Sequence, residues 1–124
     1  MRRSAVLLAV LLCACASPQR VVEQGNPQEF ASTASALALV KCVTLNARSI
    51  SDAYTADWSE LVRPDSYEAV VIRTPSPVYI YTYQPIIVAR TASAPGGSRL
   101  QLYVSSDVGP VESADWIARL RSGC

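Results

Sequence analysis

The chain has 124 residues, of which 50% are hydrophobic and 17% are charged, and its formal net charge is +1. This length allows one domain, and the apolar composition excludes an intrinsically disordered chain. The charge balance gives no reason to expect nucleic acid as a partner. Histidine is absent, which excludes Ser-His-Asp and Cys-His catalytic systems and histidine-ligated metal sites. We therefore expect a protein without catalytic activity and without a cofactor.

The N-terminal segment has the layout of a secretory signal peptide. Arg2 and Arg3 are followed by an apolar run that ends at Leu12, and small residues occupy positions 13–16. A basic start, a short apolar run and small residues are typical of such a signal. The run is shorter than the roughly 20 apolar residues that a membrane-spanning helix needs. The sequence thus predicts that residues 1–14 are removed on export.

The end of this segment, Leu12-Cys13-Ala14-Cys15, resembles the lipobox of bacterial lipoproteins. The resemblance covers this segment only. It implies that Cys15 is acylated and becomes the new N-terminus, and that several acyl chains anchor it stably. Ala16 is not the aspartate associated with inner-membrane retention, so an outer-membrane anchor facing the periplasm is implied. The alternative is ordinary signal cleavage after Ala16, because Ala14-Cys15-Ala16 also fits a small-x-small pattern.

Cys42 and Cys124 are the cysteines that remain after either cleavage. An exported compartment is oxidising, and two cysteines allow one intramolecular pairing. We predict a disulfide, worth about 4.5 kcal/mol in the chain-entropy model, that holds the C-terminus to the first helix. A functional thiol pair is the alternative, but there is no Cys-x-x-Cys motif and two thiolates without histidine make a poor zinc site.

The first elements are a tether and a helix. Residues 15–25 are polar without periodicity, which predicts a flexible tether. Asn26, Pro27 and Glu29 have the pattern of a helix start, and an alanine- and leucine-rich run continues to Ala47 with a wide apolar face. One domain is therefore expected over residues 26–124. Residues 50–63 have no clear periodicity.

The middle of the domain has the pattern of β-strands. Four runs are rich in β-branched residues or alternate in polarity: Tyr67–Thr74, Val78–Tyr83, Ile86–Thr91 and Ser98–Ser105. Pro85 cannot donate to a strand ladder, so it predicts a sheet edge, a bulge or a break. Residues 94–97 form a turn pattern, and the short connections favour antiparallel pairing.

The last element is a helix over residues 111–121, with acidic residues early and arginines late, as the helix dipole favours. Its expected inward stripe is Ala114, Ile117, Leu120 and Cys124. The predicted fold is α+β: an N-terminal helix, a three- to four-stranded antiparallel sheet and a C-terminal helix, with the helices packed on one sheet face.

Three tyrosines form the candidate partner surface. Tyr79, Tyr81 and Tyr83 share one face of their predicted strand, and exposed tyrosines are favoured in protein interfaces. The alternative is that they are ordinary strand formers on a half-exposed face.

Two sets of charged residues are interpreted as surface. The acidic residues from Asp52 to Asp65 lack the spacing of a calcium loop. The arginines Arg63, Arg73, Arg90 and Arg99 are scattered and show no phosphate-binding pattern.

The predicted function is that of a membrane-anchored envelope lipoprotein that binds another envelope protein as an interaction or assembly module. The alternative is a periplasmic module that binds a small ligand or glycan, or inhibits an enzyme. A pocket lined by Trp58, Trp116 and tyrosines would favour this alternative.

Overall fold

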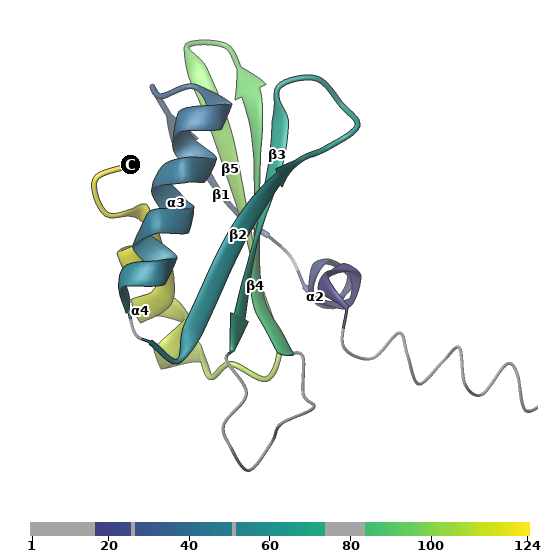
Figure 1. Cartoon of the computed structure of the whole chain (residues 1–124), viewed down its shortest axis with the longest axis vertical. Coiled ribbons are helices and arrows are strands. Elements are labelled where there is room, and N and C mark those ends of the chain that lie inside the picture. The colour runs from purple at the N-terminus through teal and green to yellow at the C-terminus, as the bar shows by residue number, and fades with distance from the viewer. Residues whose placement is uncertain (1–16, 26, 51, 74–83) are drawn as a thin grey trace, which may run out of the picture.

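The computed structural model describes residues 17–25, 27–50, 52–73 and 84–124. Within these residues, five strands form one antiparallel sheet in the order β1-β5-β4-β3-β2 (Figure 1). The strands are β1 (Gln28–Ser32), β2 (Tyr54–Glu60), β3 (Ser66–Arg73), β4 (Gln84–Ala94) and β5 (Gly97–Val104). The helices are α2 (Pro18–Gln24), α3 (Ala36–Ile50) and α4 (Pro110–Arg121). The predicted α+β class is confirmed, with five strands where three or four were predicted. The predicted strand Val78–Tyr83 lies outside the described residues.

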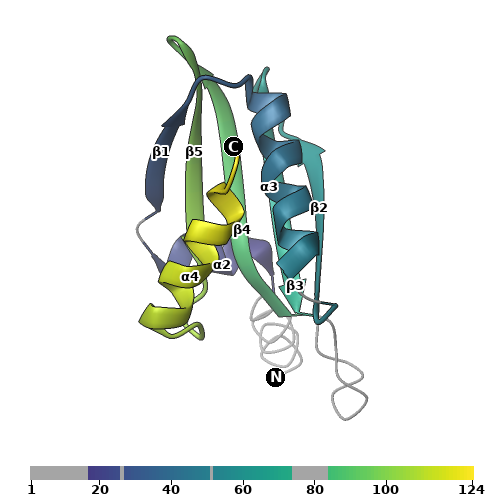
Figure 2. The same ribbon diagram turned by 90° about the vertical axis from the view of Figure 1, so that its left-hand side faces the viewer.

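The helices cover the two faces of the sheet unequally. Helices α3 and α4 lie side by side on one face (Figure 2), as predicted. The opposite face carries only α2 among the described helices, and α2 contacts β4 and β5 (Figure 1). We call this second face the open face.

The hydrophobic core lies between the sheet and the pair α3 and α4. Side chains with at most 2% exposure come from both layers; they include Leu39, Val40, Val43, Ile87, Leu100, Leu102 and Leu120. Ala69 and Ala89 are paired across β3 and β4 and are fully buried. Burial of these apolar side chains is the main favourable contribution to folding.

Alternation along the strands assigns the other side chains to the open face. The Thr91 hydroxyl donates a hydrogen bond of 2.9 Å to the Ala36 carbonyl of α3, so Thr91 faces the helices. Its neighbours Arg90 and Ala92 therefore face the other way, because successive side chains of a strand point to opposite faces.

The predicted helix start at residue 26 is wrong. Residues 28–32 form β1, which pairs with β5 and places Phe30 opposite Leu100. Helix α3 begins only at Ala36, where the Ser35 hydroxyl accepts a hydrogen bond of 3.2 Å from the Ala38 amide. A local capping signal is a weak preference, and here pairing with a distant strand overrides it.

The expected flexible tether is also corrected over Pro18–Gln24, because this segment forms α2. Pro18 stands at its first position, where a missing amide hydrogen costs nothing. Val21 is 3% exposed, and Val88 of β4, on the same face of the sheet, is fully buried. A seven-residue helix with one buried valine contains too few inward positions to show a helical repeat in the sequence. Cys15 lies outside the described residues.

Three smaller expectations have mixed outcomes. Pro85 lies beside a register shift, since Val71 pairs with Ile87 and Ile72 pairs with Pro85; of the predicted sheet edge, bulge or break, the structure shows the bulge. In α4, Ala114 is exposed and Trp116 is 4% exposed, so the inward stripe was partly wrong. The unassigned residues 50–63 contain the edge strand β2.

No helix in the described part of the chain is long and apolar enough to cross a membrane.

Candidate functional site

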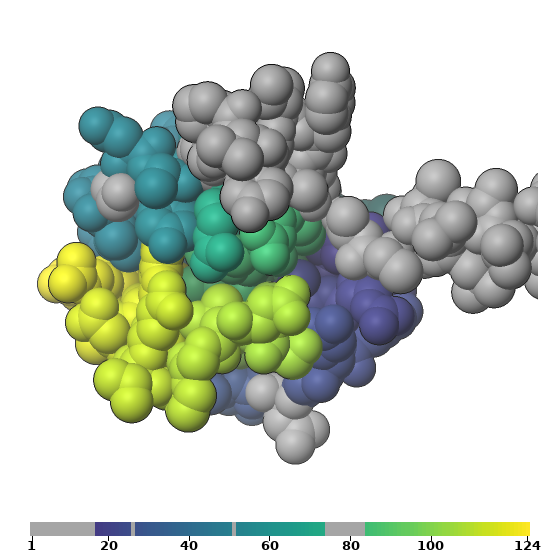
Figure 3. Space-filling view, turned by 90° about the horizontal axis from the view of Figure 1, so that it is seen from below, coloured from purple at the N-terminus to yellow at the C-terminus, as the bar shows by residue number. Residues whose placement is uncertain are grey.

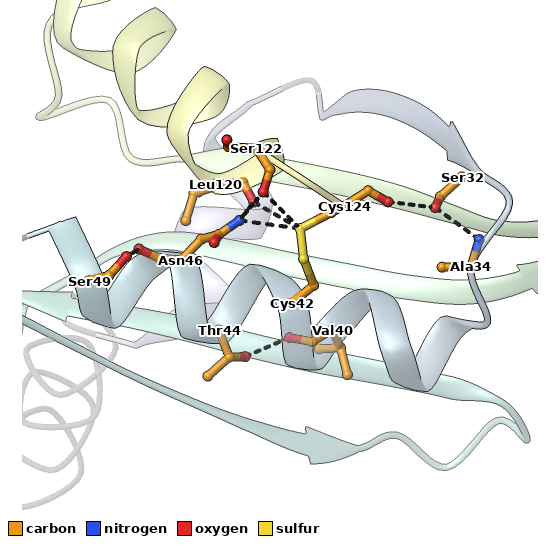
Figure 4. Close-up of a disulfide and its surroundings, with 10 residues drawn as sticks. All are labelled: Ser32, Ala34, Val40, Cys42, Thr44, Asn46, Ser49, Leu120, Ser122 and Cys124. Atoms are coloured by element: carbon orange, nitrogen blue, oxygen red, sulfur yellow. Dashed lines mark hydrogen bonds between the residues drawn. A yellow bond between two sulfur atoms is a disulfide. The ribbon is translucent and has the colours of Figure 1, made fainter.

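The C-terminus is fastened to α3 by the predicted cysteine pair. The sulfur atoms of Cys42 and Cys124 are 2.10 Å apart in a disulfide, and their Cα atoms are 5.9 Å apart (Figure 4). Asn46, one turn further along α3, donates hydrogen bonds of 2.8 Å to the carbonyls of Leu120 and Ser122. The last carbonyls of a helix lack partners within the helix, so Asn46 satisfies the end of α4. The Ser32 hydroxyl donates to the Cys124 carbonyl at 3.1 Å.

A cavity of about 300 Å³ lies beside this disulfide. Its lining joins β1 and β5 to both helices of the covered face and consists of Phe30, Ala31, Ser32, Thr33, Leu39, Leu100, Arg121 and Cys124. The Arg121 guanidinium lies 3.5 Å from the centre of the Phe30 ring. This cavity combines an apolar wall with one cation.

A second hollow, of about 310 Å³, is lined by side chains of the open face. Three of its lining residues are the arginines Arg63, Arg90 and Arg99, which come from the β2–β3 connection, β4 and β5. The strand register explains their meeting, because Ala92 lies opposite Arg99 on β5 and Arg90 lies opposite Gln101. We call this feature the arginine hollow.

The arginine hollow carries more positive than negative charge. Arg90 forms an ion pair of 2.8 Å with Glu68, and the Arg90 guanidinium lies 5.8 Å from the centre of the Tyr103 ring. The described residues contain two other ion pairs, Arg48–Asp57 and Arg119–Asp115, so neither Arg63 nor Arg99 has an acidic partner there. Gln101 donates a hydrogen bond of 2.8 Å to Glu29 at the rim.

The expectation that these arginines are scattered is therefore wrong for three of them. Arg73 lies at the other end of β3, opposite Gln84. The turn at residues 94–97 could have predicted that Arg90 and Arg99 share a face. Pairing the strands outward from this turn places residue 99 opposite residue 92, which lies on the same face as residue 90. The position of Arg63 depends on the β2–β3 connection, which the sequence pattern did not resolve.

The other predicted site residues are not brought together. Tyr79, Tyr81 and Tyr83 lie outside the described residues. Trp116 is packed in the core against Tyr54, with ring centres 4.5 Å apart, and so is not available as a pocket wall. Trp58 lies on edge strand β2 and contacts Tyr67.

The acidic residues likewise form no site. Asp57 is bound to Arg48, and no group of three or more potential metal-ligating side chains occurs within the part of the chain that the structure describes.

No protein-family model, no curated protein and no solved structure matches this chain.

Proposed function

We propose that the chain is a bacterial envelope lipoprotein that is anchored through Cys15 in the outer membrane, faces the periplasm, and acts without catalysis as an interaction or assembly module. The lipobox-like Leu12-Cys13-Ala14-Cys15 supports the anchor, and the position of α2 gives the anchored domain an orientation. This helix starts three residues after Cys15 and is packed on the open face of the sheet.

The packing of α2 would fix the orientation of an anchored domain. Val21 is the buried residue of α2, which contacts β4 and β5 of the sheet. Gln24, at the end of α2, accepts a hydrogen bond of 3.3 Å from the Ser106 amide. Figure 3 shows α2 and the segment before α4 at the same end of the molecule. Three residues span at most about 10 Å, so an acylated Cys15 would hold the domain against the bilayer with its open face toward the lipid.

A domain held this way presents its two sheet edges sideways, and the edges differ. On β2, Arg48 donates to the Ala56 carbonyl at 2.7 Å and pairs with Asp57, so one carbonyl of this edge strand is occupied. Exposed side chains occur on both edges, including Gln28 and Glu29 on β1 and Ser59 and Glu60 on β2, so the occupied carbonyl of β2 is the difference between the two edges. Addition of a partner strand to a sheet edge is a common mode of recognition. We assign the envelope-protein partner to the β1 edge, and the tyrosine surface remains a prediction.

The test uses cells that express the full chain with a photo-crosslinking residue at Gln28, grown with labelled palmitate. We expect label on the protein, loss of label in Cys15→Ala, and retained label in Cys13→Ala, because Leu12 is too bulky to precede an acylated cysteine. We also expect a crosslinked envelope protein from position 28 and none from the matched position Ser59 on β2.

An unlabelled wild-type protein would disprove the anchor. Equal crosslinking from positions 28 and 59 would disprove the assignment of the partner to β1.

The alternative, a periplasmic module that binds a small ligand or glycan or inhibits an enzyme, is favoured by a different observation. The cavity beside the disulfide is about 300 Å³, the lower end of the usual size of ligand sites. A labelled protein that crosslinks to no other protein would favour the small-ligand or glycan form of this alternative.

A further inference from the structure

We propose that the arginine hollow binds the phosphate of an anionic phospholipid headgroup, so that the open face touches the membrane as well as facing it. This inference rests on the lipid anchor proposed above for the direction in which the membrane lies. The recognition chemistry itself rests on the side chains of the hollow.

The hollow supplies the donors that a phosphate needs. Arg63, Arg90 and Arg99 approach from three separate elements, and a guanidinium offers a planar pair of donors that fits phosphate oxygens. Ala92 lies between β3 and β5, opposite Ser66 on one side and Arg99 on the other. Its small side chain leaves space among the longer arginines, and a hollow of about 310 Å³ has room for one headgroup.

The three arginines have different roles. Arg90 is held by Glu68 and by the Tyr103 ring, and its side chain is 34% exposed. The Glu68 carboxylate largely balances the charge of Arg90, so we assign Arg90 the role of shaping the wall of the hollow rather than of neutralising the anion. Arg63 and Arg99 are exposed and have no acidic partner among the described ion pairs. Their two charges are the ones that an incoming anion would neutralise.

The source of the phosphate follows from where α2 lies. Arg90 is two residues from Val88 along β4, a distance of about 7 Å, and Val88 is buried on the face that α2 covers. Figure 1 shows the β2–β3 connection, which carries Arg63, on the same side of the sheet as α2. The helix that leads to the anchor and the arginine hollow are therefore neighbours on one face. A bilayer reached through α2 would bring headgroups to this hollow.

The experiment uses the full chain in micelles of a neutral maltoside detergent and follows the backbone amides of Ala92, Arg99 and Gln101 by NMR. Three probes are titrated separately: phosphatidylglycerol, phosphatidylcholine and inorganic phosphate. We expect saturable chemical-shift changes at these amides with phosphatidylglycerol. The apparent affinity fitted from them should be at least tenfold higher than that for zwitterionic phosphatidylcholine. Inorganic phosphate is expected to compete.

The variant Arg63→Gln/Arg99→Gln is expected to weaken phosphatidylglycerol binding about 25-fold, since each arginine near an anionic surface contributes roughly a factor of five. Lys41→Gln/Arg119→Gln is the matched control, because it also removes two positive charges, from exposed positions on α3 and α4 on the opposite side of the sheet. It should change binding by less than twofold.

Each other outcome overturns a stated part of the proposal. Binding of inorganic phosphate without preference for phosphatidylglycerol would overturn the lipid assignment and leave a site for free phosphate. No shift with any probe, or equal loss in the control variant, would overturn the site. Palmitate labelling of Cys15 is read independently, so failure of the anchor and failure of the hollow are distinguishable.

Discussion

Gly97 is the residue at which the fold leaves no space for a side chain. A Cβ atom added there would lie 2.1 Å from the Ser32 carbonyl oxygen and 2.8 Å from the Thr33 Cα. Both neighbours are backbone atoms, so neither can rotate away. Its neighbour Gly96 has a φ of 81° but open space around it. Both glycines have a positive φ that favours glycine, 81° at Gly96 and 151° at Gly97, but only Gly97 also lies against backbone atoms.

We predict that Gly97→Ala destabilises the protein much more than Gly96→Ala. The Gly96 change carries only the cost of the left-handed conformation, about 1–2 kcal/mol. The Gly97 change must also move β5 away from the end of β1, and we expect a loss of more than about 3 kcal/mol, as for other severe overpacking. Urea unfolding of the two variants measures both values. Equal losses would show that the β1 end can shift freely.

Hydrogen bonds from buried hydroxyls connect the sheet to the start of α3. Ser98 donates to the Ala34 carbonyl at 2.7 Å, and Thr91 donates to the Ala36 carbonyl at 2.9 Å. Within the described residues, every buried polar side-chain atom has a hydrogen-bond partner. The sequence predicts Ser98 and Thr91 as strand residues, but their partners lie more than 50 positions away and could not be read from local pattern.

Helix α2 is the shortest of the described helices. It has seven residues, and isolated helices shorter than about 12 residues are marginal in water. Val21 is its one buried residue. We infer that its helical state is maintained by packing on β4 and β5 rather than by its own propensity.

We predict that Val21→Ser releases α2 from the sheet and leaves the rest of the domain folded. Burial of a valine side chain contributes about 1.5–3 kcal/mol, which is comparable to the stability of so short a segment. Amide hydrogen exchange should accelerate at least tenfold over residues 19–24, while β3 and β4 keep their protection. Gln19→Ser is the control, because Gln19 is exposed. If α2 and the sheet lost protection together, α2 would belong to the cooperative core.

The two N-terminal segments whose structure differs from the sequence prediction differ for the same reason. Residues 28–32 were predicted as helix and 18–24 as tether, yet both adopt structures that depend on the sheet. β1 is completed by β5, and α2 is completed by β4 and β5. The local sequence pattern of each segment cannot identify its partner strands, because these lie about 70 residues later in the chain.

Across the whole molecule, the disulfide joins residues separated by 82 positions. It links the middle of α3 to the chain end that follows α4, and Asn46 and Ser32 hold the same end by hydrogen bonds. Chain termini fray unless they are fastened. The bridge therefore fixes the second helix of the covered face onto the first.

We predict that Cys124→Ser lowers the free energy of unfolding by about 2–4 kcal/mol, chiefly because the unfolded chain regains freedom in a long loop. Cys42→Ser/Cys124→Ser should lose no more than the single variant, since one bond is removed in both cases. Urea unfolding followed by tryptophan fluorescence measures the difference. A double variant that loses clearly more stability than Cys124→Ser would contradict the prediction. Two free thiols in protein taken from the cell envelope would also contradict it.

The sequence by itself determined the α+β class, the antiparallel strands β3, β4 and β5, an irregularity at Pro85, the last helix and the pairing of Cys42 with Cys124. These features follow from local periodicity, proline chemistry and cysteine arithmetic, which are properties of short segments or of simple counts. Only the tertiary structure decided that residues 28–32 are a strand, that α2 covers the open face, and that Arg63, Arg90 and Arg99 share one hollow. Each of these depends on strand register and on contacts between distant segments, and a one-residue change in register would turn those side chains to the other face.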